Sequence, residues 1–269
     1  MATPIGNLED LSPRARRVLE QAAIIAAEDT RRTAQLLSSF GCKTPLMALH
    51  EHNETERLPH LLARLQAGQS VALVSDAGTP LISDPGFQLV RASQEQGLVV
   101  VPVPGASAVM AALQAAGLPT DRFVFEGFLP RKALKRRERL AALAGETRTI
   151  VLFEAVHRVA ATLADLVSSF GADRGACLAR ELTKLHEEVV PGSLGALHAA
   201  LSNGKIPQRG EFVILVAGAS EQVSADLAEA RRVYDLLNGA LSPDAALKLT
   251  ARITGLGRNE LYAALRANP

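Results

Sequence analysis

Short apolar runs alternate with longer amphipathic segments along most of the chain, and this alternation limits the possible folds more than any other feature. The runs are rich in β-branched or small apolar side chains and lie at Ile24–Ala27, Val71–Ser75, Leu98–Val103, Thr149–Phe153, Ala176–Ala179 and Phe212–Val216. Helical patterns of about ten to fifteen residues separate them. Such alternation predicts an α/β fold whose sheets are mainly parallel.

A break in this pattern predicts a domain boundary. The turn-forming stretch Gly117–Asp121 follows a helical pattern, and the next strand-like run, Phe123–Phe128, leads directly into a basic segment. Strand-like runs stop near Ser220 and three helical segments follow, at 221–238, 242–252 and 258–267. We therefore expect an N-terminal α/β domain (1–118), a second α/β domain (119–220) and a small C-terminal helix-turn-helix-like domain (221–269).

Three polar-residue and proline pairs predict helix starts. Ser12-Pro13, Asp84-Pro85 and Ser242-Pro243 each place a capping side chain before a proline that suits the first helical position. The connections between strands and helices are therefore expected to be short.

Composition narrows the class of protein. Of the 269 residues, 48% are hydrophobic, which is enough for a sizeable core and excludes a disordered chain. The two cysteines, Cys42 and Cys177, have neither a CxxC spacing nor histidines at metal-ligand spacing, so we expect no disulfide framework and no metal. No apolar run approaches the length of a membrane span, and no apolar signal region opens the chain, so a cytoplasmic protein without a membrane partner is predicted.

The net charge of the chain says little about its binding partners, whereas the distribution of basic residues says more. The net charge of +1 does not point to a nucleic acid, but the segment Arg131–Arg139 carries six basic residues in nine positions. A run of this kind is equally compatible with an ordinary solvated helix face and with a surface that binds phosphates.

Three glycine-bearing loops follow predicted strands, where open α/β sheets bind ligands. They are Thr3–Asn7, Ser75–Gly86 and Pro104–Ala108, and neither a GxGxxG nor a GxxxxGK[ST] fingerprint accompanies them. Small residues let the backbone approach a ligand closely, and the Asp76 carboxylate can accept hydrogen bonds from an amine, an amide or a ribose hydroxyl. One such loop is compatible with a simple turn, whereas three together favour a nucleoside-like cofactor.

Longer motifs extend over nearly the whole chain. They are ATPIGNLEDLSPRA (Ala2–Ala15), AAEDTRRT (Ala26–Thr33), HEHNE (His50–Glu54), SDAGTPLISDPG (Ser75–Gly86), VPGASA (Val103–Ala108), FEAVHR (Phe153–Arg158), ARELTKLHEE (Ala179–Glu188) and GEFVILVAG (Gly210–Gly218). With these motifs the chain resembles the tetrapyrrole methylase superfamily, and within it the 16S rRNA cytidine 2′-O-methyltransferase family.

The resemblance implies a fold, a cofactor and a reaction. It implies two α/β domains with S-adenosylmethionine in the cleft between them, and a homodimer. The reaction implied is 2′-O-methylation of a cytidine, expected at position 1402, in the decoding region of 16S rRNA in the small ribosomal subunit. The matching cofactor positions are Pro4, Asp76, Gly78, Ile82 and Ser107 in the first domain, and Phe153, Glu154 and Glu211 in the second.

Two departures from the family pattern affect these expectations. Only Met1 and Ala2 precede the TPIGN loop, so its strand is expected to be truncated or very short and the loop less well anchored. Val156 stands where the family has proline, which loosens a local turn without removing a functional group.

The residues near the methyl acceptor are predicted from polar motifs that have no obvious role in the core. A ribose 2′-hydroxyl is a poor nucleophile until it loses its proton, so a base or a cation should lie near it. We expect the catalytic residues to be Asp29, Arg32, Glu181 and Lys184, with Lys184 stabilising charge and Glu181 orienting it. An ion pair between domains is the alternative for residues 180–184, and an ordinary loop histidine is the alternative for His52.

The C-terminal domain and the basic segment Arg131–Arg139 help to indicate whether the substrate is an RNA. Lys248, Arg252, Arg258 and Arg266 could face phosphates, although a plain helical hairpin would show the same pattern. Two other functions stay open: methylation of a tetrapyrrole carbon, which would not need these basic parts, and a non-catalytic RNA-binding assembly factor.

Overall fold

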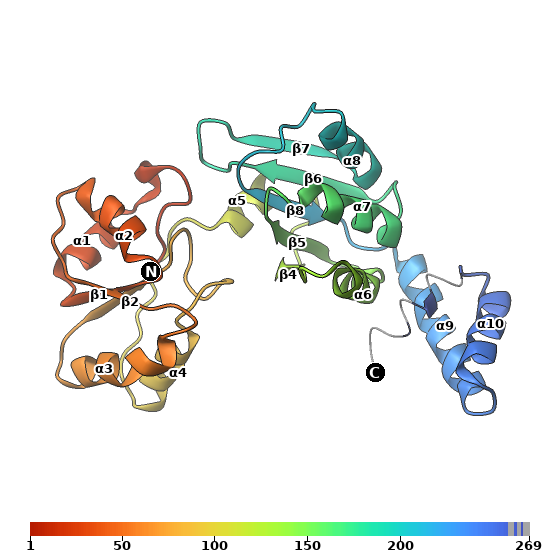
Figure 1. Ribbon diagram of the computed structural model, residues 1–269, viewed down its shortest axis with the longest axis horizontal. Helices are drawn as coiled ribbons and strands as arrows, with labels where there is room; N and C mark the ends of the chain where they lie inside the picture. The colour runs from red at the N-terminus through yellow and green to blue at the C-terminus, as the bar shows by residue number, and fades with distance from the viewer. Residues whose placement is uncertain (258–260, 263–264, 266–269) are drawn as a thin grey trace. The chain divides into compact units, whose positions relative to one another are not determined.

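The computed structural model describes the chain except residues 258–260, 263–264 and 266–269. The chain forms two compact units, coloured red to yellow and yellow-green to blue in Figure 1. Unit 1 comprises Met1–Ala111 together with Leu182–Leu185, and unit 2 comprises Ala112–Glu181 together with the rest of the chain from His186.

A three-stranded parallel sheet forms the centre of unit 1. Its order is β2 (Leu46–Ala48), β1 (Ile24–Ala27) and β3 (Val71–Val74). Helices α1 (Pro13–Gln21) and α2 (Thr30–Ser38) lie on one side of it, and α3 (Glu54–Gln66) and α4 (Phe87–Glu95) on the other (Figure 1). All of β1 is buried because its side chains alternate between two apolar clusters, with Ile25 and Ala27 in one and Ile24 and Ala26 in the other.

Unit 2 is built on a five-stranded sheet. Its order is β4 (Phe123–Phe128), β5 (Thr149–Glu154), β8 (Phe212–Val216), β6 (Gly175–Arg180) and β7 (Glu188–Ser193). Only β4 and β5 are parallel, because β8 runs antiparallel to both of its neighbours and β6 and β7 form an antiparallel pair. The expectation of mainly parallel sheets is therefore confirmed in unit 1 and wrong in unit 2.

Three helices cover one face of this second sheet. They are α6 (Ala133–Leu143), α7 (Val159–Phe170) and α8 (Leu194–Ser202) (Figure 1). Leu140, Leu163 and Leu197 from these helices share one core cluster with Ile150 and Ile214 of the sheet. The cluster includes residues of β5 and β8, the strands next to which the polar residues Glu154 and Glu211 lie.

Two helices follow the second sheet, as the sequence predicts. They are α9 (Glu221–Asn238) and α10 (Pro243–Thr254), and Ala230 of α9 packs with Leu247 and Leu261. The third predicted segment, 258–267, falls mostly outside the described residues. No helix in the described part of the chain is both long and apolar enough to span a membrane.

The strand predicted at Leu98–Val103 is wrong. This segment has no strand partner in the described part of the chain, and Val99 and Val101 are 86% and 61% exposed. Its Pro102 and Val103 carbonyls accept hydrogen bonds from Arg14 and Ala2 instead. β-branched composition favours an extended backbone, but a strand also needs a neighbour for its N–H and C=O groups.

Two of the three predicted helix starts are confirmed. Ser12 accepts a hydrogen bond from Ala15 N at the start of α1, and Ser242 does the same for α10. Asp84-Pro85 does not start a helix, because α4 begins at Phe87 after Gly86, whose φ of 113° only glycine adopts readily. The Glu54 carboxylate of α3 caps α4 instead, accepting from Gln88 N at 2.9 Å.

Candidate functional site

The three predicted ligand loops meet in unit 1. Thr3 and Gly78 exchange backbone hydrogen bonds of 2.9 and 3.0 Å, which join the first loop to the second. Thr79 Oγ1 donates to the Ala106 carbonyl at 3.1 Å, which joins the second loop to the third. No strand precedes the first loop, but this isolated β-bridge anchors it, contrary to expectation, and the Met1 amine adds a hydrogen bond to the Leu73 carbonyl at 2.8 Å.

The second loop holds an unusual backbone. Gly78 has a φ of 83°, and a Cβ there would lie 3.2 Å from the Ile5 side chain. Leu81 and Ser83 also have positive φ, 72° and 67°, which is unfavourable for residues other than glycine. Strain of this kind persists where the surroundings enforce it and is concentrated at ligand sites. Between these two residues lies Ile82, 41% exposed.

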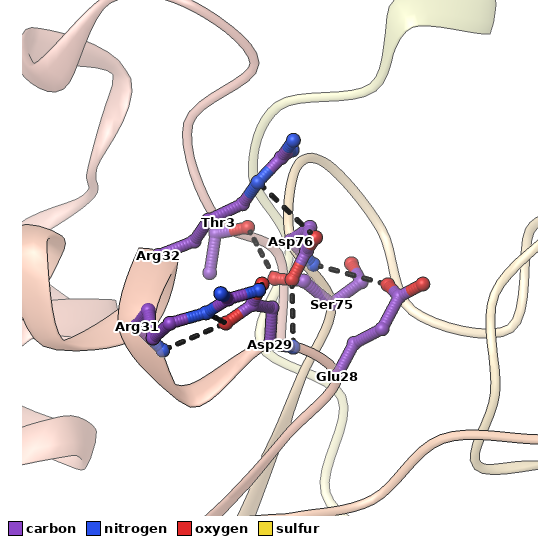
Figure 2. Close-up of polar contacts among 7 residues, drawn as sticks. All are labelled: Thr3, Glu28, Asp29, Arg31, Arg32, Ser75 and Asp76. Carbon is purple, nitrogen blue, oxygen red and sulfur yellow. Dashed lines mark hydrogen bonds and ion pairs between the residues drawn. The ribbon is translucent and has the colours of Figure 1, made fainter.

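Asp76 lies at the centre of a polar network at the ends of β1 and β3 (Figure 2). Its carboxylate accepts a 2.8 Å hydrogen bond from Asp29 N, and its own N–H donates to Glu28 Oε2 at 3.3 Å. Arg32 Nε lies 3.5 Å from Asp76 Oδ2, and its side chain is 65% exposed. Asp76 is therefore held by the two residues that follow β1, and it is only partly neutralised, by one solvent-exposed cation.

The Asp29 carboxylate is hydrogen-bonded to the start of a helix and to a neighbouring arginine side chain. It is the N-cap of α2, accepting from Arg31 N at 2.8 Å, and it binds the Arg31 guanidinium through both oxygens at 3.1 and 2.7 Å (Figure 2). The hydrogen bonds from Arg31 hold the pKa of this carboxyl far below its usual range. Asp29 therefore stays ionised, which makes it a weak proton acceptor.

Two further carboxylates complete the cluster, and sequence reasoning assigned neither to the site. Burial raises the pKa of Glu28, although a hydrogen bond from Asp76 N opposes the shift. Burial also raises the pKa of Asp84 to about 6, against a hydrogen bond from Ser75 and with the help of the charges of Glu28 and Asp76. The position of Glu28 directly after a buried strand was the available signal; for Asp84 the helix-start pattern was misleading.

Lys184 lies in the segment Leu182–Leu185, which belongs to unit 1 although the chain before and after it belongs to unit 2. A Cβ on Gly6 would lie only 2.3 Å from Lys184 Cγ, so glycine is required where the TPIGN loop meets this side chain. Thr183, with a φ of 65°, adds another strained position in the same segment. The structure thus brings one predicted catalytic residue beside a predicted cofactor loop.

Glu181 lies in unit 2 and is hydrogen-bonded to Glu211, directly before the start of β8. Its N–H donates to the Glu211 carbonyl and its Oε1 accepts from Glu211 N, both at 3.0 Å. A Cβ on Gly210 would lie 2.4 Å from Glu181 Oε1, so this glycine leaves room for the carboxylate. The φ of Glu181 is 52°, so a strained backbone again accompanies a predicted catalytic residue.

Two of the cofactor positions predicted in the second domain are Glu154, which is buried, and Phe153, which packs against other aromatic rings. Glu154, 2% exposed, accepts hydrogen bonds from Ala155 N and Thr162 Oγ1 and lies 3.2 Å from Arg158 Nε. Its carboxylate thereby fixes the FEAVHR turn, while its predicted contact with a cofactor stays a prediction. Phe153 packs edge-to-face on Phe125 and Phe128.

The structure therefore places the predicted residues in two groups. Unit 1 holds Pro4, Asp29, Arg32, Asp76, Gly78, Ile82, Ser107 and Lys184, and unit 2 holds Phe153, Glu154, Glu181 and Glu211. Ser107 precedes α5 (Ala108–Ala115), where its hydroxyl lies 3.5 Å from Met110 N.

The histidine loop after β2 has a structural explanation. The Asn53 side chain accepts from His50 N at 2.8 Å and donates to the Ala48 carbonyl at 3.1 Å. His52 lies with its ring centroid 6.1 Å from that of His50. Within the described residues, no three His, Cys, Asp or Glu side chains come together as a metal site.

The basic segment 131–139 divides into an inner and an outer face. Arg136 points inward, with a side chain 7% exposed and 2.7 Å from Asp165 Oδ2, so it is not part of the predicted exposed face. Arg139 binds Glu126 through two nitrogens. Arg131, Lys132 and Arg137 are exposed and have no ion-pair partner among the described residues.

The basic residues of the C-terminal helices are only partly described. Lys248 and Arg252 lie exposed on α10, while Arg258 and Arg266 fall outside the described residues. The buried face of α10 is formed by Ala246, Leu247 and Thr250.

Comparison with known proteins identifies the class. Residues 2–198 match the family described as Tetrapyrrole (Corrin/Porphyrin) Methylases, and residues 224–268 match the RsmI C-terminal HTH domain. The chain belongs to the tetrapyrrole methylase family.

Relatives narrow the family to a branch. The chain is 54% identical to Ribosomal RNA small subunit methyltransferase I of Xylella fastidiosa (strain Temecula1 / ATCC 700964), over 97% of this chain and 96% of the relative. It is 48% identical to the protein of the same name from Escherichia coli O157:H7, over 97% and 91% of the two chains. It is a member of this ribosomal RNA methyltransferase branch, and the predicted methyltransferase class and S-adenosylmethionine cofactor are confirmed.

Solved structures agree on the fold. Diphthine synthase matches with a TM-score of 0.59 at 17% identity, over 80% of this chain and 87% of that one. Uroporphyrin-III-C-methyltransferase from Thermus thermophilus matches with a TM-score of 0.53 at 21% identity, over 84% and 94%. At these identities the similarity extends to the α/β fold alone.

Proposed function

We propose that this chain transfers a methyl group from S-adenosylmethionine to the 2′-oxygen of a cytidine in small-subunit ribosomal RNA. The observation that carries the proposal is the similarity, over 97% of the chain, to relatives named for methylation of small-subunit ribosomal RNA. The joined loops of unit 1 support it, because they offer close backbone approach and negative charge in one place.

The residues of unit 1 fit this cofactor. S-adenosylmethionine supplies an electrophilic methyl carbon on a positively charged sulfur. Asp76, Gly78 and Ile82 would hold it from the strained second loop, with Pro4 and Ser107 on the loops joined to it. The partly neutralised carboxylates complement a cation, since a positive ligand favours their ionised forms. Phe153, Glu154 and Glu211 would contribute from unit 2.

The acceptor residues have distinct tasks in this proposal. The 2′-oxygen must pass its proton to a base or to water as its bond to carbon forms, while the carbon–sulfur electron pair stays on sulfur. Asp29, kept ionised by Arg31, would orient the Arg31 cation toward a phosphate, and Arg32, held beside Asp76, would add a second cation from α2. Lys184 would stabilise the negative charge that develops on the 2′-oxygen, and Glu181 would orient Lys184.

Mapping of 2′-O-methylation tests the proposal. Purified chain and S-adenosylmethionine are added to small ribosomal subunits from cells that lack this protein, and the sites are read by mass spectrometry of nuclease fragments. We expect one new 2′-O-methylcytidine in the decoding region, and none with a Lys184→Ala variant. Methylation of a different RNA, of a base, or of a tetrapyrrole only would refute the proposal.

Three finer expectations belong to the same proposal. We propose a homodimer that acts in the cytoplasm and binds the RNA directly, with position 1402 as the methylated cytidine. Light scattering tests the dimer, and the mapping experiment tests the position.

A further inference from the structure

Phe128 is an exposed aromatic side chain on an edge strand. It is the last residue of β4, which lies at one edge of the unit 2 sheet, and it is 56% exposed. Its ring contacts Phe153 at a centroid distance of 5.6 Å and an interplanar angle of 61°. Phe153 is held in turn by Phe125 at 4.9 Å. The Phe128 ring is therefore supported from one side and open to solvent on the other.

Uncompensated positive charge follows this ring along the chain. Arg131 and Lys132 come three and four residues after Phe128, so their α-carbons lie at most about 14 Å from it. Arg137 lies on the second turn of α6, about 7 to 8 Å along the helix from Lys132. All three are exposed without an ion-pair partner among the described residues, whereas Arg136 and Arg139 are neutralised by Asp165 and Glu126.

We propose that Phe128, Arg131, Lys132 and Arg137 form a docking site for an unpaired stretch of RNA, in which one base stacks on the Phe128 ring and the cations bind phosphates. An aromatic face stacks with any base, and cations bind the backbone without regard to sequence. A base within a duplex is already stacked on both sides, so the site selects single-stranded RNA. The inference rests on the proposed function and adds the form of the RNA and the surface that binds it.

The absence of tryptophan from the chain provides a direct probe. In the Phe128→Trp variant the only indole lies at the proposed stacking position. We expect its fluorescence to be quenched by a short unstructured RNA oligonucleotide and to change little with the same sequence in a duplex. Phe170→Trp is the matched control, since Phe170 also lies in unit 2 beside a cation, Arg174 at 5.3 Å, but at the far end of α7. Equal quenching of both variants, or equal quenching by the duplex, would overturn the site.

Affinity measurements separate stacking from charge. Phe128→Ala should weaken binding of the oligonucleotide about tenfold, while Phe128→Tyr should bind like the parent chain. Replacing Arg131, Lys132 and Arg137 by alanine should lower the dependence of log Kd on log salt by about 2, because each phosphate contact contributes about 0.7. An acidic peptide that quenches Phe128→Trp as strongly as RNA would also overturn the proposal, since it would reduce the site to a charged patch.

Two controls keep this inference distinct from the proposed function. Thermal melts with S-adenosylmethionine report cofactor binding, which Phe128→Tyr and the replacements of Arg131, Lys132 and Arg137 should not alter. Unchanged RNA affinity in Phe128→Ala, with methylation of ribosomal subunits intact, would remove the docking site and leave the enzyme. Failure of the parent chain to methylate any small subunit would instead contradict the proposed function.

Discussion

Asp76 in unit 1 and Glu154 in unit 2 both stand at the carboxyl end of a sheet strand, β3 and β5, but their surroundings are opposite. Glu154 is 2% exposed and is satisfied by Arg158, Thr162 and its own loop. Asp76 is partly exposed beside two other carboxylates, Glu28 and Asp84, with Arg32 as its nearest cation. A satisfied carboxylate stabilises the fold, whereas crowded carboxylates repel one another and favour a positive ligand.

The largest effect is expected from Glu154→Ala. The change leaves the Arg158 guanidinium, 14% exposed, without its counter-charge, so the free energy of unfolding should fall by about 3 to 5 kcal/mol. Urea unfolding measures it. A loss below about 1 kcal/mol would mean that Glu154 does not hold unit 2 together, and the contrast with Asp76 would fail.

Gly210→Ala should have the next largest effect and sharpens the contrast within unit 2. The new Cβ meets the Glu181 carboxylate, so the variant should lose about 1 to 3 kcal/mol more than Gly204→Ala. Gly204 is a matched control, because its φ of 78° is similar to the 85° of Gly210 and nothing lies within 4 Å of its Cβ position. Methylation should fall only in Gly210→Ala; equal stability and activity of the two variants would show that Glu181 does not depend on this glycine.

Asp76→Ala should change function more than stability. The hydrogen bond from Asp29 N is lost, but repulsion of Glu28 and Asp84 is relieved, so the free energy of unfolding should change by no more than about 1 kcal/mol. Calorimetric titration should show weaker binding of S-adenosylmethionine. Cofactor binding that matches the parent chain would remove Asp76 from the site.

The last expected effect is a pH dependence at Asp84. Its pKa is raised from 3.8 to about 6 in the folded state, so between these pH values the folded chain binds more protons than the unfolded chain. Stability should therefore fall as the pH rises from about 4 to about 6, and the loss should persist at neutral pH. Asp84→Asn should flatten this slope in thermal melts, and its stability at pH 7 should be at least that of the parent. An unchanged slope would assign the pH dependence to another group.

Most of the fold was predictable because its signals are local. Apolar runs gave β1, β3, β5, β6 and β8, and serine-proline pairs gave the starts of α1 and α10. β7 contains Pro191 and Gly192, which disfavour strands, so no local pattern indicated it. Leu98–Val103 failed for the opposite reason, since its composition favours a strand but no strand among the described residues pairs with it.

The loops of the candidate site could be predicted from the sequence, whereas its charged residues could be predicted only in part. The glycine-bearing loops TPIGN, SDAGTPLISDPG and PGASA were identified from sequence, and they meet as expected in unit 1. Glu28 was not assigned and Asp84 was taken for a helix cap, because crowding between β1 and β3 depends on residues almost fifty positions apart. Arg136 was counted with the exposed cations for a similar reason, since Asp165 lies on another helix.

The sequence by itself determined the class of fold, the family and the position of the ligand loops, because periodicity, turn chemistry and long motifs are read along the chain. Only the tertiary structure decided which charges are neutralised: Glu154 and Arg136 are paired and buried, Asp76 has one solvent-exposed cation beside it, and Arg137 has no ion-pair partner among the described residues. The reason is physical, since a charge is stabilised by the groups that surround it in space, and these come from distant segments brought together by burial of the apolar core.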